Sequence, residues 1–350
     1  MPINLFDSVH GGSFRRTIFP KNVNSGHFIF TNDCNTNTNT NIDYLFVWDD
    51  ASHALKIPHS VQKTIHIATE PMWMNRYTPN FLNQFDFHIG MINSSIEGVE
   101  DIYNTLPGLD SFIPLYSNKN LYSDCKNKSK LLSIVTSNKF ISQSKEHKKR
   151  YEFCKKLKQH FGDRIDWYGK GVNYIENKLD GLKNYRFHIC LENNYQKDMF
   201  TEKLADAFIA NCYPIHGAHP SAQNFFPKNA LQTINVDDFQ GAVKIIEHAI
   251  ANNFDKLYSE QLNIAKELVT NDYNLFQIIT DFVEKIENNE IQQVGQPQRI
   301  IHDRILPIKD VARFDRSNKY KAISKILPMY HIWNIERSLM KKKRALRERS

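Results

Sequence analysis

The stretch that most constrains the fold of this chain runs from Tyr185 to Pro220. Apolar and polar residues alternate over its first seven positions, and aromatic and β-branched types are frequent, which predicts a strand. After a polar loop, Thr201 and Glu202 predict a helix start, because a threonine caps the first turn and a carboxylate suits the helix dipole. Asn211 ends this helix, and a short strand over residues 212–216 ends at a glycine. The order predicts a βαβ unit, in which a helix N-terminus commonly holds phosphate.

The same stretch contains several uncommon residues in one order, in the segments LENN, TEKLADAF and PIHGAHP. These segments resemble the donor-binding motif of the family-10 glycosyltransferases, which are the α-1,3/α-1,4-fucosyltransferases. The residues that match the family motif are Phe187, Glu192, Asn193, Thr201, Glu202, Lys203, Ala207, Pro214 and Gly217.

Length and composition are those of a soluble globular protein with room for two domains, since the chain has 350 residues, of which 41% are hydrophobic. No apolar run of about 18 residues predicts a membrane helix. The first residues lack the apolar core of a signal peptide. The five cysteines are scattered and form no C-x-x-C pair, which argues against a disulfide framework or a zinc site. We therefore expect a cytoplasmic protein.

The net charge of +7 is concentrated at the C-terminus. From Glu336 to Ser350 there are seven Lys and Arg residues and two Glu residues, which gives +5. A protein that binds nucleic acid over its whole surface would spread its basic residues more widely. The amphipathic tail Lys321 to Ser350 instead predicts peripheral binding to the anionic inner face of a membrane. The alternative is that its apolar residues pack on the protein and its end has no fixed structure.

Glu70 is the candidate general base. The sequence TIHIATE predicts a strand that ends at Glu70, and Pro71 holds that backbone extended. A carboxylate at the carboxyl end of such a strand points into the ligand crevice of an open α/β sheet. The following segment is similar to the one after the family's catalytic glutamate, which implies the same role here; the alternative is a helix cap or a surface carboxylate. The matching residues are Pro79, Asn80, Phe81, Phe85, Asp86, Phe87, Ile89 and Gly90.

The resemblance also implies a set of donor-binding residues. Lys203 and the helix N-terminus at Thr201 would supply positive potential for a diphosphate, and Arg150 would add a forked contact to it. Glu202 would accept hydrogen bonds from ribose hydroxyls, and Asn193 would help to hold the donor. Two alternatives stay open: Arg150 lies in a charge run of the kind that is usually solvated, and Glu202 and Lys203 suit a solvated capping pair.

One position departs from the family. The family has a tyrosine two residues before its Thr-Glu-Lys segment, whereas this chain has Met199 there. Tyr195 is close enough in sequence to replace that tyrosine as a donor contact. This departure leaves open whether the transferred sugar is fucose. The segment Gly169-Lys170-Gly171 lacks the other residues of a phosphate-binding loop and predicts a turn.

We expect an α/β protein of GT-B-like architecture, with two Rossmann-like domains, a cleft between them and a basic amphipathic C-terminal tail. The predicted divisions are an acceptor-side domain over 1–128, a nucleotide-sugar domain over 129–295, and a linker with the tail over 296–350. No D-x-D segment occurs, so we expect no metal and no other cofactor. A single base opposite the leaving group implies inversion at the sugar carbon, unlike a route through a second, nucleophilic carboxylate.

The predicted function is therefore transfer of fucose from GDP-fucose to a hydroxyl of a glycan acceptor. The expected acceptor is a surface polysaccharide or lipopolysaccharide that contains N-acetylglucosamine and is presented as a lipid-linked glycan. Two alternatives remain at this stage: the same fold and mechanism with a different nucleotide sugar, and a non-catalytic protein that binds membranes.

Overall fold

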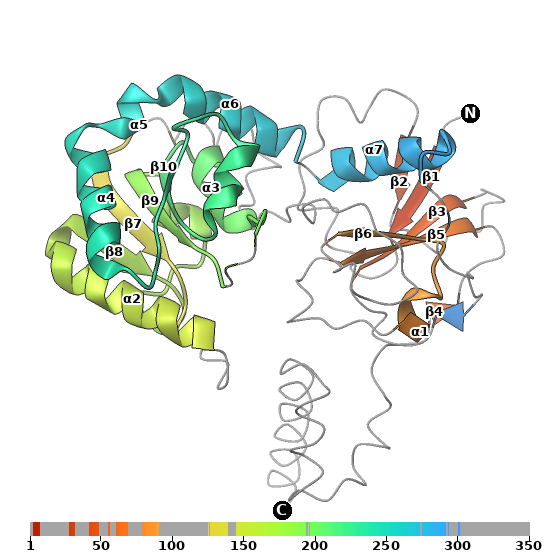
Figure 1. Cartoon of the computed structure of the whole chain (residues 1–350), viewed down its shortest axis with the longest axis horizontal. Helices are drawn as coiled ribbons and strands as arrows, with labels where there is room; N and C mark the ends of the chain where they lie inside the picture. The colour runs from red at the N-terminus through yellow and green to blue at the C-terminus, as the bar shows by residue number, and fades with distance from the viewer. Residues whose placement is uncertain are drawn as a thin grey trace, which may run out of the picture. The chain divides into compact units, whose positions relative to one another are not determined.

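The computed structural model describes residues 3–7, 28–31, 42–48, 55–56, 61–68, 79–90, 125, 127–138, 145–193, 195, 197–273, 275–291, 293 and 300–301. They form two α/β units, each built around a five-stranded sheet whose paired strands all run parallel (Figure 1). The predicted α/β class is thereby confirmed. Among the described residues, no helix has the length and apolar character needed to cross a membrane.

The sheet of the first unit has the strand order β2-β1-β3-β5-β6. A separate pair of two-residue strands, β4 (Leu55–Lys56) and β12 (Ile300–Ile301), runs antiparallel, so the chain returns to this unit late in the sequence. The strands of the main sheet are β1 (Ile3–Asp7), β2 (Phe28–Thr31), β3 (Ile42–Trp48), β5 (Val61–Ala68) and β6 (Phe87–Gly90).

Helices α1 (Pro79–Leu82) and α7 (Leu275–Glu287) lie on opposite faces of this sheet (Figure 1). On the α7 face, the ring of Phe87 packs edge-on against that of Phe282, with 6.4 Å between the centroids. In the same layer, Tyr44 of β3 donates a hydrogen bond to Glu287. Lys63 of β5 also lies 3.5 Å from the Glu287 carboxylate, so both apolar and polar contacts fix α7 to the sheet.

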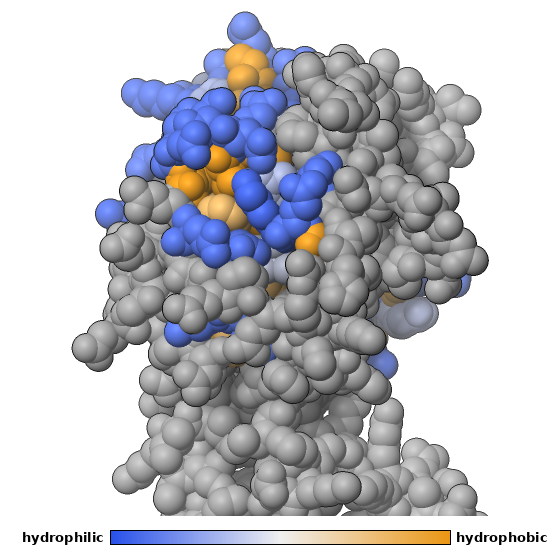
Figure 2. All heavy atoms as spheres, turned by 90° about the vertical axis from the view of Figure 1, so that its right-hand side faces the viewer, coloured by the Kyte–Doolittle hydropathy of each residue, from blue (hydrophilic) through white to orange (hydrophobic). Residues whose placement is uncertain are grey.

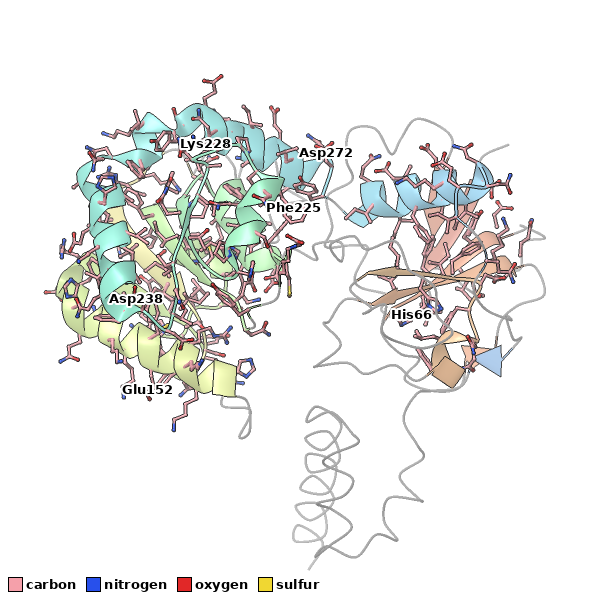
Figure 3. The ribbon with its side chains drawn as sticks, viewed as in Figure 1. His66, Glu152, Phe225, Lys228, Asp238 and Asp272 are labelled. Carbon is pink, nitrogen blue, oxygen red and sulfur yellow. The ribbon has the colours of Figure 1, made fainter. Side chains whose placement is uncertain are left out.

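The α1 face of the sheet carries two buried histidines on neighbouring strands. His66 and His88 are register partners on β5 and β6, and their ring centroids are 5.5 Å apart. The rings of Phe81 and Phe85 lie 5.4 and 5.2 Å from that of His66, which Figure 3 labels on the α1 side of the sheet. Burial, with a smaller effect of His66, lowers the pKa of His88 well below its usual value. His88 therefore packs as a neutral core residue.

The outward surface of the first unit is more polar than this interior. On the face that Figure 2 shows, the described side chains are mostly hydrophilic, with a smaller group of hydrophobic ones between them. The side chains of the sheet strands, by contrast, include Leu45, Phe46, Val47 and Ile65, each at most 1% exposed. This division between interior and surface supports the sheet as the core of the unit.

The sheet of the second unit has the order β11-β10-β9-β7-β8. When the strands of each sheet are numbered in chain order, both sheets have the order 2-1-3-4-5. The second strand therefore lies on one side of the first strand, and the remaining three lie on its other side. This reversal makes a switch point, which in the second unit lies between β7 and β9; ligands of open α/β sheets bind at the carboxyl ends of strands there. The strands are β7 (Lys130–Val135), β8 (Ile165–Tyr168), β9 (Tyr185–Leu191), β10 (Tyr213–Gly217) and β11 (Gln232–Thr233).

Helices cover both faces of the second sheet, with α2 and α4 on one side and α3 and α6 on the other (Figure 1). The rings of Phe153 and Phe239 join α2 to α4, with 5.9 Å between centroids. Asp238, labelled in Figure 3, caps α4 by accepting a hydrogen bond from the Gly241 amide at 2.9 Å. The helices are α2 (Lys145–Phe161), α3 (Glu202–Ile209), α4 (Phe239–Ala251), α5 (Phe254–Leu257) and α6 (Ser259–Thr270).

The predicted elements between Tyr185 and Gly217 are confirmed, including the helix stop, since Asn211 has the left-handed φ of 54°. Elsewhere the structure has three features that the sequence does not indicate. Strand β1 was not predicted, because its INLFD sequence mixes polar and apolar residues without a clear period. Residues 253–288 hold three helices, because the four-residue helix α5 is separate from α6 and α7. Strand β5 begins at Val61, within a stretch too polar to assign from sequence.

The predicted domain boundaries at residues 128 and 295 stay predictions. Most of α7, from Thr280 onward, packs with the first unit, while the elements from β7 to α6 form the second. Lys128 belongs to the second unit, where its ammonium bonds the carbonyl oxygens of Lys183, at 3.0 Å, and Ala210. The amphipathic tail predicted for 321–350 lies outside the described residues.

The segment Gly169-Lys170-Gly171 is the predicted turn, and it packs tightly on the loop after β7. Gly169 has a φ of 144°, and a Cβ atom at this position would come within 2.2 Å of the Thr136 carbonyl oxygen. The Asn138 amide donates to the Lys170 carbonyl oxygen at 3.0 Å. The glycine is therefore required both by its backbone angle and by its neighbour.

Replacement of Gly169 by alanine is expected to lower the free energy of unfolding by about 3 kcal/mol, from backbone strain and the clash together. Gly162→Ala is the matched control, because Gly162 also has a positive φ of 57° but a Cβ there would meet nothing within 4 Å. The Gly162→Ala substitution should lower the free energy of unfolding by only about 1 kcal/mol. Equal losses for the two variants in urea titrations would contradict the close packing at Gly169.

Candidate functional site

The carboxyl end of β9 and the N-terminus of α3 meet beside the switch point of the second sheet. Glu192 directly follows β9, and its amide donates to the Gly217 carbonyl oxygen at the end of β10, at 3.1 Å. Thr201 is the N-cap of α3, as predicted: its backbone is extended, with φ −130°, and its side-chain oxygen accepts from the Lys203 amide. The residues of the LENN and TEK segments are thus brought together.

The Glu192 carboxylate is the centre of this arrangement. Its Oε1 accepts hydrogen bonds from the Thr201 amide at 3.1 Å and from the Thr201 hydroxyl at 2.7 Å. The ammonium of Lys203 lies 3.4 Å from Oε2, and Nε2 of His216 lies 3.5 Å from Oε1. Because the Glu192 side chain is only 1% exposed, these groups take the place of water around it.

Burial of the carboxylate works to raise the pKa of Glu192, but the opposing effects are larger. The Lys203 charge, the nearby His216 and the Thr201 hydrogen bonds together lower the pKa of Glu192 far below its usual value. Burial works to lower the pKa of Lys203, and the carboxylates of Glu192 and Glu202 outweigh it and raise that pKa. Both side chains are therefore charged over the whole neutral range.

Lys203 and Glu202 are accessible residues of the site. The Lys203 ammonium lies 2.9 Å from Glu202 Oε1 and donates to the Thr201 hydroxyl oxygen at 3.0 Å. About a fifth of each side chain is exposed, 23% for Lys203 and 22% for Glu202, so a ligand can reach both. The predicted capping pair is therefore present, but the two charges are held in a fixed arrangement and are only partly solvated.

Arg150 reaches the same place from α2. Its Nη1 donates to the carbonyl oxygen of Leu191, the last residue of β9, at 3.4 Å. Burial lowers the pKa of Arg150, although the nearby carboxylates of Glu192 and Glu202 act in the opposite direction; a guanidinium stays charged in proteins all the same. Its neighbour Lys148 is exposed, whereas Arg150 is only partly so. Arg150 therefore differs from a solvated charge run and lies beside the carboxylate cluster.

The other predicted donor contacts lie in the loop between β9 and α3. Asn193 is half-buried, and Tyr195 is 48% exposed with its ring 5.3 Å from that of His219. Met199 is only 3% exposed, so it is part of the core rather than of an accessible surface. The next residue, Phe200, is held by aromatic neighbours, which anchors the loop; they are Phe225, Phe226 and Tyr273. Figure 3 labels Phe225 at this side of the unit.

Glu70 lies outside the described residues. Strand β5 ends at Ala68, two positions earlier, so the predicted strand leads toward Glu70. Within the described residues no group of three or more His, Cys, Asp or Glu side chains is placed to hold a metal ion. The roles predicted for Glu70 and for the donor-binding residues, and the expectation that no metal is needed, stay predictions.

The sequence did not reveal two features of this site. Glu192 was recognised only as part of a matching segment, although its side chain joins Thr201, Lys203 and His216. His216 was not singled out, because one histidine in an apolar strand gives no signal until its partner in space is known. Outside the Glu192 cluster, the fully buried Asp206 pairs with Lys178 from a distant turn.

Comparison with known proteins identifies the second unit. Residues 125–274 match the sequence model of glycosyltransferase family 10 (fucosyltransferase), C-terminal part. They form a family-10 glycosyltransferase domain. This family-10 domain contains Arg150, Asn193, Tyr195, Thr201, Glu202 and Lys203, whereas Glu70 precedes it.

Curated relatives of the chain include fucosyltransferases from bacteria and mammals. The chain is 30% identical over 123 residues to an alpha-(1,3)-fucosyltransferase of Helicobacter pylori, a match that covers 33% of this chain and 26% of that enzyme. It is 26% identical over 208 residues to the 4-galactosyl-N-acetylglucosaminide 3-alpha-L-fucosyltransferase 9 of Bos taurus, covering 57% and 54%. The chain thus spans about a quarter and about half of these two relatives.

Solved structures show the same fold beyond the family-10 domain. An alpha1,3-fucosyltransferase with GDP aligns with a TM-score of 0.52 and 20% identity, over 85% of this chain and 94% of that one. The structure of an alpha1,3-fucosyltransferase with GDP-fucose aligns with a TM-score of 0.52 and 19% identity, over 84% and 93%. The predicted GT-B type of fold is therefore confirmed.

The lowered pKa of Glu192 gives a test of the site by acid unfolding. The contribution of this carboxylate to stability is complete above its unfolded-state pKa of 4.5 and is lost as pH falls toward its lower folded-state pKa. The difference in unfolding free energy between wild type and Glu192→Gln should be constant above about pH 5.5 and should shrink below it by up to about 1.4 kcal/mol per pH unit. A difference that stays constant down to pH 3 would contradict the buried charged carboxylate.

Proposed function

We propose that the chain is a glycosyltransferase that moves fucose from GDP-fucose to a hydroxyl group of a glycan. The observation that carries this proposal is the cluster of Arg150, Thr201, Glu202 and Lys203 at the carboxyl end of β9, inside the part of the chain that matches the family. The similarity to an alpha1,3-fucosyltransferase that was solved with GDP-fucose supports the same donor.

In this proposal the family-10 domain holds the donor. Arg150, Lys203 and the N-terminus of α3 at Thr201 contact the diphosphate, because all three present positive potential. Glu202 accepts hydrogen bonds from the ribose hydroxyls, since an ionised carboxylate only accepts. Asn193 and the exposed ring of Tyr195 contact the rest of the donor.

Glu70 takes the proton from the acceptor hydroxyl. The hydroxyl oxygen then attacks the sugar carbon while the bond from that carbon to the diphosphate breaks. One base on the side opposite the leaving group gives inversion of configuration. The positive charges of Arg150 and Lys203 stabilise the leaving diphosphate, and the reaction needs no divalent metal ion.

The acceptor that we propose is a glycan containing N-acetylglucosamine, of the kind found in surface polysaccharide or lipopolysaccharide. The name of the Bos taurus relative describes transfer to a 4-galactosyl-N-acetylglucosaminide, which supports a disaccharide of this type. Because Met199 stands where the family has tyrosine, a different nucleotide sugar is the second candidate donor.

The direct test is to incubate the purified full chain with the galactosyl-N-acetylglucosamine disaccharide, excess chelator and one donor at a time. GDP-fucose should give a fucosylated product whose new linkage, read by proton NMR, has the configuration opposite to that of the donor. GDP-mannose and a panel of UDP-sugars are the comparison donors. Transfer from one of these and not from GDP-fucose would contradict the donor assignment, and strict loss of activity in chelator would contradict metal independence.

Glu70→Gln is expected to reduce turnover by about 1,000-fold or more, because the amide cannot accept the acceptor proton. The dissociation constant for GDP, measured by calorimetry, should stay within about threefold, since the base does not hold the nucleotide. Glu284→Gln is the matched control: Glu284 is an exposed carboxylate on α7, and its loss should change neither value. Wild-type turnover in Glu70→Gln would show that Glu70 is not the base.

We propose further that the enzyme works in the cytoplasm, on the inner face of the membrane, where a lipid-linked acceptor is presented. The support is the sequence of the tail Lys321 to Ser350, in which apolar residues precede seven Lys and Arg residues. Each basic residue near an anionic leaflet contributes about 1 kcal/mol, which suffices for reversible binding when an apolar face also inserts.

Deletion of residues 321–350 should therefore abolish flotation of the protein with vesicles that contain anionic lipid. Turnover on the soluble disaccharide should be unchanged. Binding of the full chain should also weaken as salt rises, because charges are screened over about 8 Å at physiological ionic strength. Continued flotation of the truncated protein, or loss of its fold, would contradict the tail as a membrane anchor.

A further inference from the structure

Glu192 differs from the other charged residues of the donor site because no ligand can reach it. Its side chain is 1% exposed, whereas Lys203 is 23% exposed. Both of its oxygens are engaged by protein groups, namely the Thr201 amide, the Thr201 hydroxyl and the Lys203 ammonium. Glu192 therefore makes no direct contact with a bound nucleotide, and it acts through its neighbours and through its charge.

The first of these neighbours is Lys203, whose position depends on Glu192 through Thr201. A hydroxyl has one proton to donate and two lone pairs. The Thr201 hydroxyl donates its proton to Glu192, with oxygen-to-oxygen distances of 2.7 and 2.8 Å. Its lone pairs are then turned toward Lys203, whose ammonium nitrogen lies 3.0 Å away and whose amide nitrogen lies 3.4 Å away. The carboxylate thus fixes where the ammonium is held.

The second effect of Glu192 is on the net charge of the site. The positive charges of Lys203 and Arg150 stand beside the negative charges of Glu192 and Glu202, so the four charges sum to zero. A nucleoside diphosphate carries about three negative charges at neutral pH, counting the group freed by bond cleavage. If one negative charge were removed from the site, the positive charge of Lys203 would be balanced less completely. The site would then attract a nucleoside diphosphate more strongly.

We propose that Glu192 is a positioning residue that holds the Lys203 ammonium and offsets its charge, so that the nucleoside diphosphate product leaves quickly. This inference rests on the proposed function. In that reaction the bond between the sugar carbon and the diphosphate oxygen breaks, and the electron pair stays on the diphosphate. The product is therefore more negative than the donor was, and release of product limits turnover in many enzymes. A site of zero net charge favours that release.

The test is calorimetry of GDP binding at pH 7.5, together with steady-state kinetics, for wild type and Glu192→Gln. The variant should bind GDP about 3- to 10-fold more tightly, because the substitution removes one negative charge close to the bound nucleotide. The effective dielectric constant around this charge lies between those of water and of the protein interior. Its kcat should fall and its KM for the donor should fall with it. If Glu192 had a purely structural role, the variant would bind GDP more weakly than wild type, because the substitution would loosen the site.

Two further variants separate charge from geometry. Glu192→Asp keeps the charge while disturbing the hydrogen bonds, so its GDP affinity should remain within about twofold of wild type. In a Lys203→Met background, Glu192→Gln should tighten GDP binding less than in the wild-type background, because without the ammonium the buried carboxylate is held less strongly in its charged form and the substitution removes less negative charge. If Glu192→Gln tightens GDP binding by the same factor in both backgrounds, the proposed dependence on Lys203 is wrong.

The outcomes distinguish this inference from the proposed function. A wild-type chain that binds no GDP would overturn the proposed function, and this inference with it. GDP binding by wild type, with unchanged or weaker binding by folded Glu192→Gln, would overturn this inference alone. If Glu192→Gln does not fold, Glu192→Met removes the same charge and carries the same expectation. Failure of both to fold would also overturn the inference, because the carboxylate would then serve stability rather than release.

Discussion

The interaction on which the candidate site depends is the contact of the buried Glu192 carboxylate with Thr201 and Lys203. It ties the carboxyl end of a central strand to the first turn of the following helix, between two residues that are nine positions apart in the sequence. A buried carboxylate without such partners would be protonated or would destabilise the fold. Here the partners are the cap and the first basic residue of α3, so the need to satisfy Glu192 also fixes the two groups proposed to face a diphosphate.

The arrangement of the second sheet explains why the cluster forms at this place. The strand order reverses between β7 and β9, so the loops leaving these strands diverge and leave their carboxyl ends accessible. Arg150 reaches the end of β9 from α2, which lies on the opposite side of the sheet from α3. Groups from two helices and one strand therefore meet at the switch point, although 53 positions separate Arg150 from Lys203 in the sequence.

Much of the second unit's local structure could be predicted from the sequence. The alternation over Tyr185–Leu191, the Thr201 cap and the left-handed stop at Asn211 are local signals, and each is confirmed. Strand β1 was missed because its residues have no clear period and its pairing with β2 and β3 decides its structure. The contact of His216 with Glu192 was missed for a related reason, since it joins a residue of β10 to the residue that follows β9, and the sequence does not state the register of these two strands.

The central claim is that GDP binds at the carboxyl end of β9, between the loop after that strand and the start of α2. Hydrogen–deuterium exchange with and without GDP tests this most directly. The account predicts slower exchange in peptides covering residues 147–155 and 191–206, and unchanged exchange in peptides from α5 and α6. Saturating GDP that leaves residues 191–206 unprotected, or that protects only peptides of other elements, would contradict it.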